Sequence, residues 1–490
     1  MSAAGPGGTG GARSAGGADE EQQHATTKVV LISVVAAIGG FLFGFDTSVI
    51  NGAVDAVTDQ FALSAALSGF AVSCALLGAA VGAWFAGRLA DRFGRKAVMV
   101  IGGVLFAISA VGSGFAFAVW DLILWRVVGG LGVGVASVIA PTYIAEVAPA
   151  YIRGRLGSLQ QLAITVGIFA ALLSDAFIAN TAGGAGETTW LGWEAWRWMF
   201  VVGVIPSLVW AFLALQIPES PRYLIAKGQN HKAGEVLRSV LGNLSVEAVQ
   251  RKISDIRASM RREDEPSLRD LRGPRFGLLP IVWVGILLSV FQQAVGINVI
   301  FYYSTTLWRA VGFEESQALT TSVITSVTNV VVTFIAIATV DRIGRKPLLT
   351  AGSIGMVVSL AVMAISFSQA TGSGEDISLP QPWGTIGVIA ANLYVISFGA
   401  TWGPVVWVLL GEMFPNKIRA AGLAVAAAAQ WLANFAVSTT FPSLAGIGLQ
   451  FAYGLYAVIA LLSLVFVLKA VRETKGRELE EMDDDAPARA

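Results

Sequence analysis

The sequence has little charge for its length. Lys and Arg number 33, Asp and Glu also number 33, and together they make up 13% of the 490 residues, whereas about 25% of an average soluble chain is charged. Hydrophobic residues make up 55%, and the mean hydropathy is +0.67. The equal numbers of basic and acidic residues give no bulk field that would attract nucleic acid. This composition argues against a water-soluble protein of two or three domains and predicts an integral membrane protein.

Residues that build metal and redox sites are almost missing. The single cysteine, Cys74, excludes an internal disulfide, a zinc-ribbon cluster and a CxxC redox centre. The two histidines, His24 and His231, lie in polar stretches and cannot form a metal site between them. The sequence also lacks the G-x-S-x-G, HExxH and Walker A motifs. We therefore expect no metal, no organic cofactor and no enzymatic activity.

Long apolar runs, in contrast, are abundant. A bilayer core about 30 Å thick requires about 20 apolar residues per helix, and the sequence contains twelve such runs, six on each side of a long polar stretch. We therefore expect an all-α membrane protein with two six-helix bundles. The predicted spans are 29–50, 66–87, 97–118, 121–142, 157–178, 196–216, 277–304, 317–340, 347–368, 384–411, 419–440 and 449–470.

The polar segments divide the chain into five parts. Residues 1–27, rich in Gly, Ala and Ser, predict a disordered tail. The bundles are expected at 28–216 and 276–470, and 471–490 form a second tail. The central segment 217–275 spaces Leu, Val and Ile among charged residues, which is typical of short amphipathic helices lying on the inner face. The alternative for this segment is a solvated linker.

The distribution of Lys and Arg predicts the orientation in the membrane. Loops 51–65, 179–195, 369–383 and 441–448 contain neither residue, and Arg309 is the exception on that side. The other set of loops carries Arg88, Arg92, Arg95, Lys96, Arg153, Arg155, Arg342, Arg345, Lys346, Lys417 and Arg419. We therefore expect this second set, the central segment and both termini to lie in the cytoplasm of a multi-pass plasma-membrane protein.

The two halves share charged motifs. Asp-Arg-Phe-Gly-Arg-Lys at 91–96 matches Asp-Arg-Ile-Gly-Arg-Lys at 341–346, and Glu-x2-Pro-x3-Arg at 146–153 matches the same pattern at 412–419. These repeats predict a duplicated bundle. Opposite charges at neighbouring helix ends predict salt bridges that close the cytoplasmic side, formed by Asp91, Arg92, Arg95, Glu146, Arg153, Asp341, Arg342, Arg345, Glu412 and Arg419. The alternative, that the charges only set topology, explains the arginines but not the paired glutamates.

A carboxylate lies within the first apolar run. A central Asp in a transmembrane helix costs roughly 2.5–3.5 kcal/mol on insertion scales, so Asp46 should face a cavity, carry a proton or be paired. The nearest candidate cation is Arg126 in the fourth run. Because arginine stays charged, an Asp that alternates between this partner and a proton would act as a proton switch. The alternative is a static buried pair.

Amide side chains recur in the apolar runs. In the seventh run, Gly296 permits local unwinding of the kind that builds transporter sites. Amides both donate and accept hydrogen bonds and indole rings stack on C–H faces, so the set suits a ligand with many hydroxyl groups. The alternative for any single amide is adhesion between helices. The candidates are Gln161, Gln292, Gln293, Asn298, Tyr302, Asn329, Trp407, Gln430, Trp431 and Asn434. The glycine-rich run 129–134 is similar to a phosphate loop, but its apolar context instead predicts close helix packing.

With these residues in place, the sequence resembles the sugar porter family of the major facilitator superfamily over about residues 28–482. The resemblance rests on GRLADRFGRK at 87–96, PESPRYL at 218–224, QQAVGIN at 292–298, VDRIGRKPL at 340–348 and ETKGRELEEM at 473–482. Within the family, it is nearest to actinobacterial glucose permeases and bacterial sugar–proton symporters.

The resemblance implies a set of roles. Asp46 and Arg126 would form the proton-coupling pair, and Tyr302 and Asn434 would lie near the sugar or the outer gate. Ile168 favours glucose over xylose, and Gly203 replaces a glutamate that helps tune the arginine in the xylose symporter. The sugar would be contacted by Gln161, Gln292, Gln293, Asn298, Asn329, Trp407, Gln430 and Trp431.

The function that this resemblance implies is proton-coupled import of a monosaccharide, D-glucose first, by a monomer whose partners are the sugar and the bilayer. The alternatives are a facilitative uniporter and a symporter for xylose, galactose or inositol. A drug or organic-ion antiporter is disfavoured because the fifth run lacks a Gly-Pro-rich motif. A membrane sugar sensor is disfavoured by the short tail after the last run.

Overall fold

We describe a computed structural model of the chain, which covers residues 15–149, 152–242, 245–262, 268–274, 277–371, 378–415 and 418–474. Twelve helical segments in these ranges are long and apolar enough to cross a membrane. This confirms the twelve predicted spans, with helix ends that differ by a few residues. Between described residues, β-structure is confined to two isolated bridges, one of which joins Thr188 to Glu194 and the other Thr371 to Ser378.

The first six spans contain eight helices, because the first and sixth spans are each interrupted once. They are α1 (Ala15–Ser48), α2 (Ile50–Gln60), α3 (Ala65–Phe93), α4 (Arg95–Gly114), α5 (Val119–Val147), α6 (Arg153–Ala182), α7 (Ala195–Val202) and α8 (Val204–Gln216). Helix α1 begins at Ala15, so residues 15–27 are helical where the sequence predicts a disordered tail. Residues 1–14 of that predicted tail lie outside the described residues.

The central segment contains short helices, as predicted. They are α9 (Pro221–Ala226), α10 (Asn230–Leu241), α11 (Val246–Arg262) and a 3-10 turn at Leu268–Leu271. Ser220 caps α9 by accepting a hydrogen bond from the Tyr223 N–H. Helices α9 and α10 pack together, with Leu224, Ile225 and Ala233 buried between them. The segment is therefore folded rather than a solvated linker.

The last six spans are interrupted at two places, and the short helix α14 follows the end of the seventh span at Tyr302. Their helices are α12 (Pro280–Ala294), α13 (Ile297–Tyr302), α14 (Ser304–Arg309), α15 (Glu315–Ile343), α16 (Arg345–Ser368), α17 (Trp383–Ser397), α18 (Gly403–Met413), α19 (Arg419–Ile447) and α20 (Leu449–Ala470). The predicted break at Gly296 is present between α12 and α13. A π-helical turn at Phe398–Trp402, which the sequence does not predict, joins α17 to α18. Pro404 follows this turn and has no N–H to continue a regular helix.

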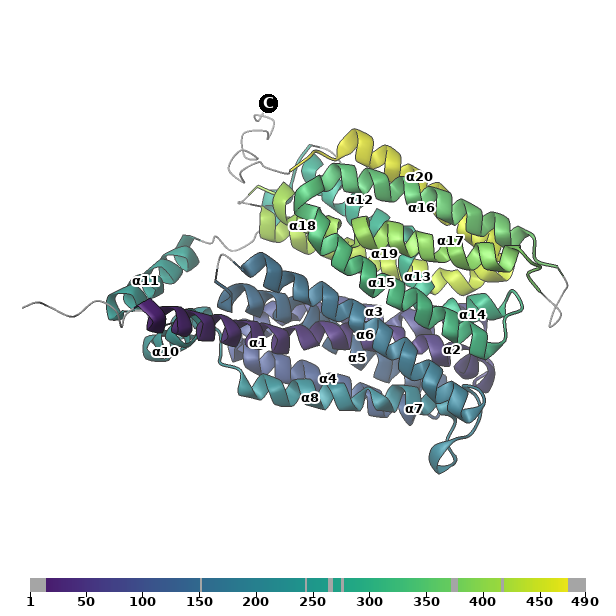
Figure 1. Cartoon of the computed structure of the whole chain (residues 1–490), viewed down its shortest axis with the longest axis horizontal. Coiled ribbons are helices and arrows are strands. Elements are labelled where there is room, and N and C mark those ends of the chain that lie inside the picture. Colours follow the sequence, from purple (N-terminus) through teal and green to yellow (C-terminus); the bar gives the residue numbers. More distant parts are fainter. Residues whose placement is uncertain are drawn as a thin grey trace, which may run out of the picture.

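The helices form two bundles that lie side by side (Figure 1). In the first bundle α3 packs on α5 and α1 on α6, and in the second α16 packs on α20 and α12 on α19. The bundles contact each other through α3 with α19 and α6 with α15. Helices α10 and α11 lie at one end of the molecule, and α2, α7 and α14 lie at the opposite end (Figure 1). We call these the α10–α11 end and the α2–α14 end.

The glycine-rich run brings two helix backbones together. A Cβ atom on Gly130 would lie 2.0 Å from the Ala75 carbonyl oxygen, and one on Gly134 would lie 2.1 Å from the Ala79 carbonyl oxygen. Larger residues would push α5 away from α3, because real Cβ atoms do not approach this closely. The run therefore serves close helix packing, as predicted, and not phosphate binding.

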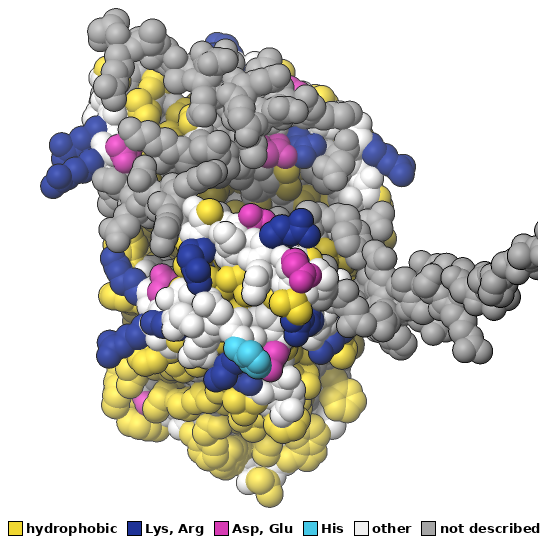
Figure 2. All heavy atoms as spheres, turned by 90° about the vertical axis from the view of Figure 1, so that its left-hand side faces the viewer, with side chains coloured by type: hydrophobic (Ala, Val, Ile, Leu, Met, Phe, Trp, Pro, Cys, Tyr) yellow, Lys and Arg dark blue, Asp and Glu magenta, His cyan; other side chains and the backbone are white. Residues whose placement is uncertain are grey.

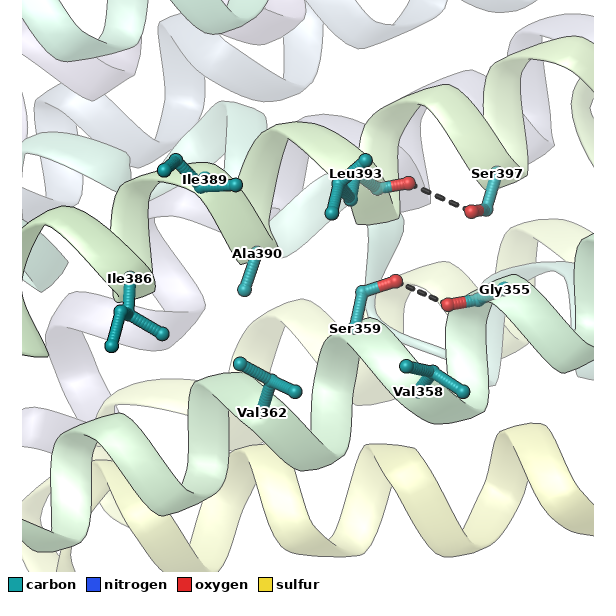
Figure 3. A pocket seen from close by; sticks show the side chains of 9 residues that line it. All are labelled: Gly355, Val358, Ser359, Val362, Ile386, Ile389, Ala390, Leu393 and Ser397. Carbon is teal, nitrogen blue, oxygen red and sulfur yellow. Dashed lines mark hydrogen bonds between the residues drawn. The ribbon is translucent and has the colours of Figure 1, made fainter.

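The surface separates apolar flanks from a charged end. Figure 2 looks onto the α10–α11 end, where Lys and Arg side chains gather together with Asp and Glu. Large apolar side chains on the flanks are exposed, such as Ile205 and Phe212 on α8. A pocket between α16 and α17 is lined mainly by aliphatic side chains, and its Ser359 and Ser397 hydroxyls donate to carbonyls of their own helices (Figure 3). These surfaces suit contact with lipid chains and not with a sugar.

Candidate functional site

The predicted pair of Asp46 and Arg126 is formed in the first bundle. The Arg126 Nη1 group donates to the Asp46 backbone carbonyl at 2.8 Å and to Asp46 Oδ2 at 3.3 Å. The Arg126 side chain is 1% exposed and that of Asp46 is 13% exposed. Gly129 allows this approach, because a Cβ atom there would lie 3.0 Å from Asp46 Oδ1. Among the described residues, Arg126 Nε has no hydrogen-bond partner, so the guanidinium is only partly satisfied.

The break in the seventh span aligns three amides. Gly296 adopts a φ of +85°, which favours glycine, and lets α13 begin at a new angle after α12. Asn298 Nδ2 donates to Gln293 Oε1 at 2.7 Å, and Gln293 Nε2 donates to Gln292 Oε1 at 3.4 Å. Gln292 Nε2 in turn donates to the carbonyls of Trp402 and Gly403, both at 3.1 Å. The amides therefore form one continuous chain that ends on the π-helical turn.

Tyr302 connects the second bundle to the Asp46–Arg126 pair. Its hydroxyl lies beside the side chains of Asn434 and Thr47, and it is close enough to Asp46 and Arg126 to interact electrostatically with both. On the same helices, the ring of Trp431 packs against that of Phe43, with centroids 5.7 Å apart. Residues of α13 and α19 thus meet α1 at the interface between the bundles.

The remaining predicted sugar-binding residues have fewer described contacts with the amide chain and with Tyr302. Gln430 Oε1 is buried and lacks a hydrogen-bond partner among the described residues, so it is free to accept a hydrogen bond from a ligand. Asn329 lies on α15 with its Oδ1 next to Gly399 of the π-helical turn. Gln161 on α6 is half-buried, and Trp407 on α18 is 44% exposed. Within the described part of the chain, no hydrogen bond joins the side chains of Gln161 or Trp407 to the amide chain.

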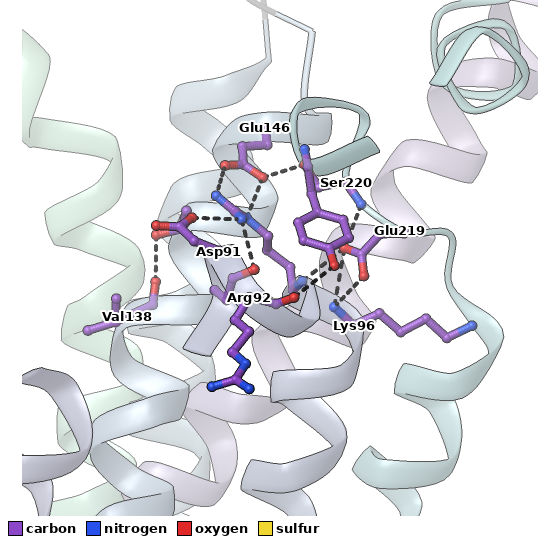
Figure 4. A network of polar contacts seen from close by, with 11 residues as sticks. Asp91, Arg92, Lys96, Val138, Glu146, Glu219 and Ser220 are labelled. Atoms are coloured by element: carbon purple, nitrogen blue, oxygen red, sulfur yellow. Dashed lines mark hydrogen bonds and ion pairs between the residues drawn. The ribbon is translucent and has the colours of Figure 1, made fainter. Parts of the chain in front are cut away.

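A charge network lies at the start of α4 (Figure 4). The Arg95 guanidinium donates two hydrogen bonds of 3.0 Å to the Glu146 carboxylate and also pairs with Asp91 at 3.2 Å. The Glu219 carboxylate accepts from the backbone N–H of Arg95 at 2.9 Å and caps the helix N-terminus, where an anion is favoured. The Ser220 hydroxyl donates to Glu146. The network therefore ties α3, α4 and α5 to the start of the central segment.

The second bundle repeats this network. Arg345 donates to the Glu412 carboxylate at 3.0 and 2.7 Å. Glu473 accepts from the backbone N–H groups of Arg345 and Lys346, both at 3.0 Å, and the Thr474 hydroxyl donates to Glu412 at 2.5 Å. Glu473 and Thr474 therefore correspond to Glu219 and Ser220 of the first bundle. Sequence reasoning missed this pair, although the shared Glu-Ser and Glu-Thr after each sixth span could have indicated it.

The other predicted gate residues are exposed or have side chains that the structure does not describe. Arg92 is exposed and stacks over the ring of Phe93, and Arg342 is also exposed. The side chains of Arg153, Asp341 and Arg419 lie outside the described residues. Both networks join helices within one bundle rather than one bundle to the other. Their predicted role in closing the cytoplasmic side stays a prediction.

The bundles are joined instead at the α2–α14 end. Asn51 on α2 is 1% exposed. Its Nδ2 donates to the Phe301 carbonyl at 2.8 Å and to Ser304 Oγ at 2.9 Å. Its Oδ1 accepts from the Thr305 N–H at 3.1 Å and from the Thr305 hydroxyl at 2.6 Å. A single buried amide thereby holds α2 against α13 and α14.

Further contacts surround this amide. Asp55 pairs with Arg309 at 2.9 Å and accepts from the Thr306 hydroxyl at 2.7 Å. In addition, the Glu315 carboxylate accepts from the Ala185 N–H at 2.7 Å, and Ser73 and Thr439 share a hydrogen bond of 2.6 Å. Arg309, the exception among the loops poor in basic residues, is thus explained by an ion pair between the bundles. Sequence reasoning missed these contacts. We call the hydrogen bonds of Asn51 and the contacts of Asp55, Glu315 and Ser73 across the bundles the α2–α14 latch.

Comparison with known proteins identifies the family. Residues 32–486 match a family model described as sugar (and other) transporter. The chain belongs to this sugar transporter family. Among similar relatives of this transporter is a glucose transport protein from Synechocystis sp., 56% identical over 455 residues, which span 92% of this chain and 96% of that protein. A D-xylose-proton symporter from Escherichia coli is 38% identical over 486 residues, covering 92% and 94% of the two chains.

Solved structures share the fold of this sugar transporter. The E. coli xylose transporter in a partially occluded inward-open conformation aligns with a TM-score of 0.79 and 36% identity, covering 92% of this chain and 100% of that one. The proton:xylose symporter of the major facilitator superfamily bound to 6-bromo-6-deoxy-D-glucose aligns with a TM-score of 0.75 and 36% identity, covering 94% and 100%. The chain therefore has the major facilitator fold over almost its whole length.

Proposed function

We propose that this sugar transporter imports a monosaccharide together with a proton across the plasma membrane, with D-glucose as the first candidate. The two bundles, 28–216 and 276–470, rock against each other so that the site between them opens to one side of the membrane at a time. Each chain carries a complete site, so the transporter works as a monomer. No further cofactor takes part, and the proton is the coupling ion.

The observation that carries this proposal is the position of Tyr302. Tyr302 is one helical turn from Asn298, the last amide of the chain in the second bundle, and it interacts with the Asp46–Arg126 pair of the first bundle. Sugar hydroxyls that bind the chain of Gln292, Gln293 and Asn298 would alter the packing of Tyr302. Protonation of Asp46 would weaken its attraction to Arg126 and free this side of the interface. Sugar and proton would therefore act on the same contact between the bundles.

The substrate is proposed from the relatives. The Synechocystis protein at 56% identity is named for glucose, while symporters named for xylose and arabinose are 38% and 34% identical. Neutral amides and tryptophan rings suit any of these sugars, so the choice between them rests on the relatives. Glucose is therefore tested first, and xylose, galactose and inositol follow.

The orientation is proposed from the charges and the latch. Basic side chains gather at the α10–α11 end, which supports the proposal that this end and both termini lie in the cytoplasm. The α2–α14 latch would then be the outer gate in its closed state. The TM-score of 0.79 with an inward-open structure supports this assignment.

The proposal is tested by uptake of labelled D-glucose into liposomes that contain the purified protein, with and without an inward proton gradient. A proton that moves down 100 mV supplies about 2.3 kcal/mol, which supports roughly fiftyfold accumulation. We expect accumulation with the gradient in the wild type and none in Asp46→Asn, which should still exchange sugar in counterflow. The matched control is Asp121→Asn. Asp121 is also buried, but it accepts a hydrogen bond from the Phe117 N–H at the start of α5 and forms no ion pair among the described residues.

Other results would contradict parts of the proposal. Gradient-independent equilibration in both the wild type and Asp46→Asn would make the protein a uniporter and reduce Asp46 to a structural role. If glucose flux is absent but another sugar is taken up with protons, the substrate is wrong and the coupling stands. Equal loss of accumulation in Asp121→Asn would show that the effect of Asp46→Asn is not specific.

A further inference from the structure

A second carboxyl group is buried between α6 and α2 and is not used in the proposed mechanism. The side chain of Asp175 is 0% exposed. Its Oδ2 accepts one hydrogen bond, from the Gly52 N–H at 3.3 Å. Its Oδ1 is buried and has no hydrogen-bond partner among the described residues. One weak bond to a neutral amide is much less than a buried carboxylate anion requires.

Among the described side chains, the helices packed on α6 bring no counter-ion to Asp175. These helices are α1, α2, α5, α7 and α15. Most of their charged groups are engaged elsewhere: Asp46 with Arg126, Asp55 with Arg309, Glu146 with Arg95, and Arg197 with Glu194. Within the described side chains, none of them forms an ion pair with Asp175. The titratable and charged groups on these helices whose side chains the structure describes are Lys28, Asp46, Asp55, Asp59, Asp121, Arg126, Tyr143, Glu146, Arg197, Glu315 and Arg342. The side chains of Asp19, Glu20, Glu21, His24 and Asp341 lie outside the described residues.

We infer that Asp175 is a second proton-binding site, which is protonated while the α2–α14 end is closed and ionises when that end opens. A neutral carboxylic acid can be buried at this position at a much lower cost than a carboxylate anion. An anion can form there only if water enters between α6 and α2. Closure therefore selects the protonated form.

The position of Gly52 connects this proton to the latch. A Cβ atom on Gly52 would lie 2.6 Å from the Asp175 Cβ, so the α2 backbone rests directly on the Asp175 side chain. The neighbouring residue, Asn51, makes the buried hydrogen bonds of the latch, and Asp55 lies one turn further along α2. Hydration of an ionised Asp175 would displace α2 and with it these contacts.

The sign of the pH effect follows from this linkage. The closed state holds one more proton than the open state, so a lower pH at the α2–α14 end favours closure. One coupled proton changes the ratio of closed to open molecules by up to about tenfold per pH unit. The assignment of the α2–α14 end to the outside rests on the proposed function. The coupling between protonation of Asp175 and closure of this end does not.

Infrared spectroscopy tests for the proton directly, with the full-length protein in liposomes and no sugar present. A protonated carboxylic acid has a C=O stretch above the amide I band that shifts in D2O. We expect such a band in the wild type, in Asp121→Asn and in Asp46→Asn, and its loss when Asp175→Asn is added to Asp46→Asn, which removes the other proton-binding carboxyl. A band that persists in this double variant, or is absent from the wild type and from Asp46→Asn, would overturn the inference. If Asp175→Asn does not fold, Asp175→Glu serves instead, and an unmoved band contradicts the assignment.

Spin-label distances test the coupling to the latch. Labels are attached to cysteines that replace Thr181 and Ala310, which are exposed on the two bundles at this end, in a Cys74→Ala background. Because Asp46 also takes up a proton, the comparison is made in the Asp46→Asn background. There we expect the closed fraction to rise as the pH falls, and to be independent of pH once Asp175→Asn is added. An unchanged pH dependence in this double variant refutes the coupling. Because neither measurement uses sugar or a gradient, failure of glucose accumulation would contradict the proposed function alone.

Discussion

Asn51 offers the sharpest test of how the bundles are held together. Replacing it with alanine removes four hydrogen bonds across the interface, to Phe301, Ser304 and Thr305. The Ser304 hydroxyl keeps Ser322 as a partner, but the Thr305 N–H and hydroxyl lose their acceptor in a buried place. Each buried group left unsatisfied costs about 1–3 kcal/mol. We therefore expect Asn51→Ala to destabilise the closed α2–α14 end by about 3 kcal/mol.

A loss of this size changes the equilibrium strongly. Since 1.4 kcal/mol corresponds to a factor of ten, the open population should rise on the order of a hundredfold. The assay is the rate at which a membrane-impermeant thiol reagent modifies a cysteine in place of Ile300, which is 3% exposed in the closed end, in a Cys74→Ala background. When opening and closing are fast, this rate follows the open population.

Asn392 provides the matched control. It donates to the Val388 carbonyl of its own helix at 2.9 Å and accepts from the Thr328 hydroxyl at 2.9 Å, both within the second bundle. Asn392→Ala should therefore lower stability without changing the modification rate at position 300. If Asn51→Ala and Asn392→Ala have the same effect, or if Asn51→Ala leaves the rate within about threefold of the wild type, the latch does not hold this end closed.

Two further predictions concern charges outside the membrane core. Glu219→Gln removes the anion that caps α4 at the Arg95 N–H, and should cost about 1 kcal/mol of unfolding free energy, measured by thermal unfolding in detergent. Asp255→Asn, at an exposed carboxyl in the middle of α11 and away from a helix end, is the control and should change little. Burial raises the pKa of Glu194, but its hydrogen bonds, chiefly that from Arg197 at 2.6 Å, outweigh this and hold the pKa below its usual value. The folded protein therefore gains stability from Glu194 above the ordinary glutamate pKa and loses it as the pH falls through the lower folded value. Arg197→Gln should lower the melting temperature at neutral pH, and the difference from the wild type should shrink on acidification. A constant difference across this range would contradict the assignment.

Local rules made much of this architecture predictable. The length of an apolar run and the cost of an unpaired backbone group in lipid define a transmembrane helix, whichever helices surround it. Two single residues were also informative. Gly296 indicated the break in the seventh span because glycine permits local unwinding, and Asp46 indicated a partner such as Arg126 because an unpaired carboxylate is costly in the membrane. The run at 129–134 could be assigned to packing because only small residues allow two helix backbones to approach this closely.

Which distant groups meet was decided only by the tertiary structure. Asn51 and Asp55 contact residues about 250 positions away, and neither carries a local signal, since an amide or a carboxylate near a helix end is ordinary. Asp175 lies within the predicted fifth span, but sequence reasoning did not single it out. Nothing near it in the chain shows that Gly52 covers it or that none of the described cations pairs with it. Charge and hydropathy along the chain thus determined the spans and the candidates. The packing of α2 against α13 and α14 decided which polar side chains pair across the bundles. Hydrogen bonds and ion pairs depend on atomic positions that only the assembled helices define.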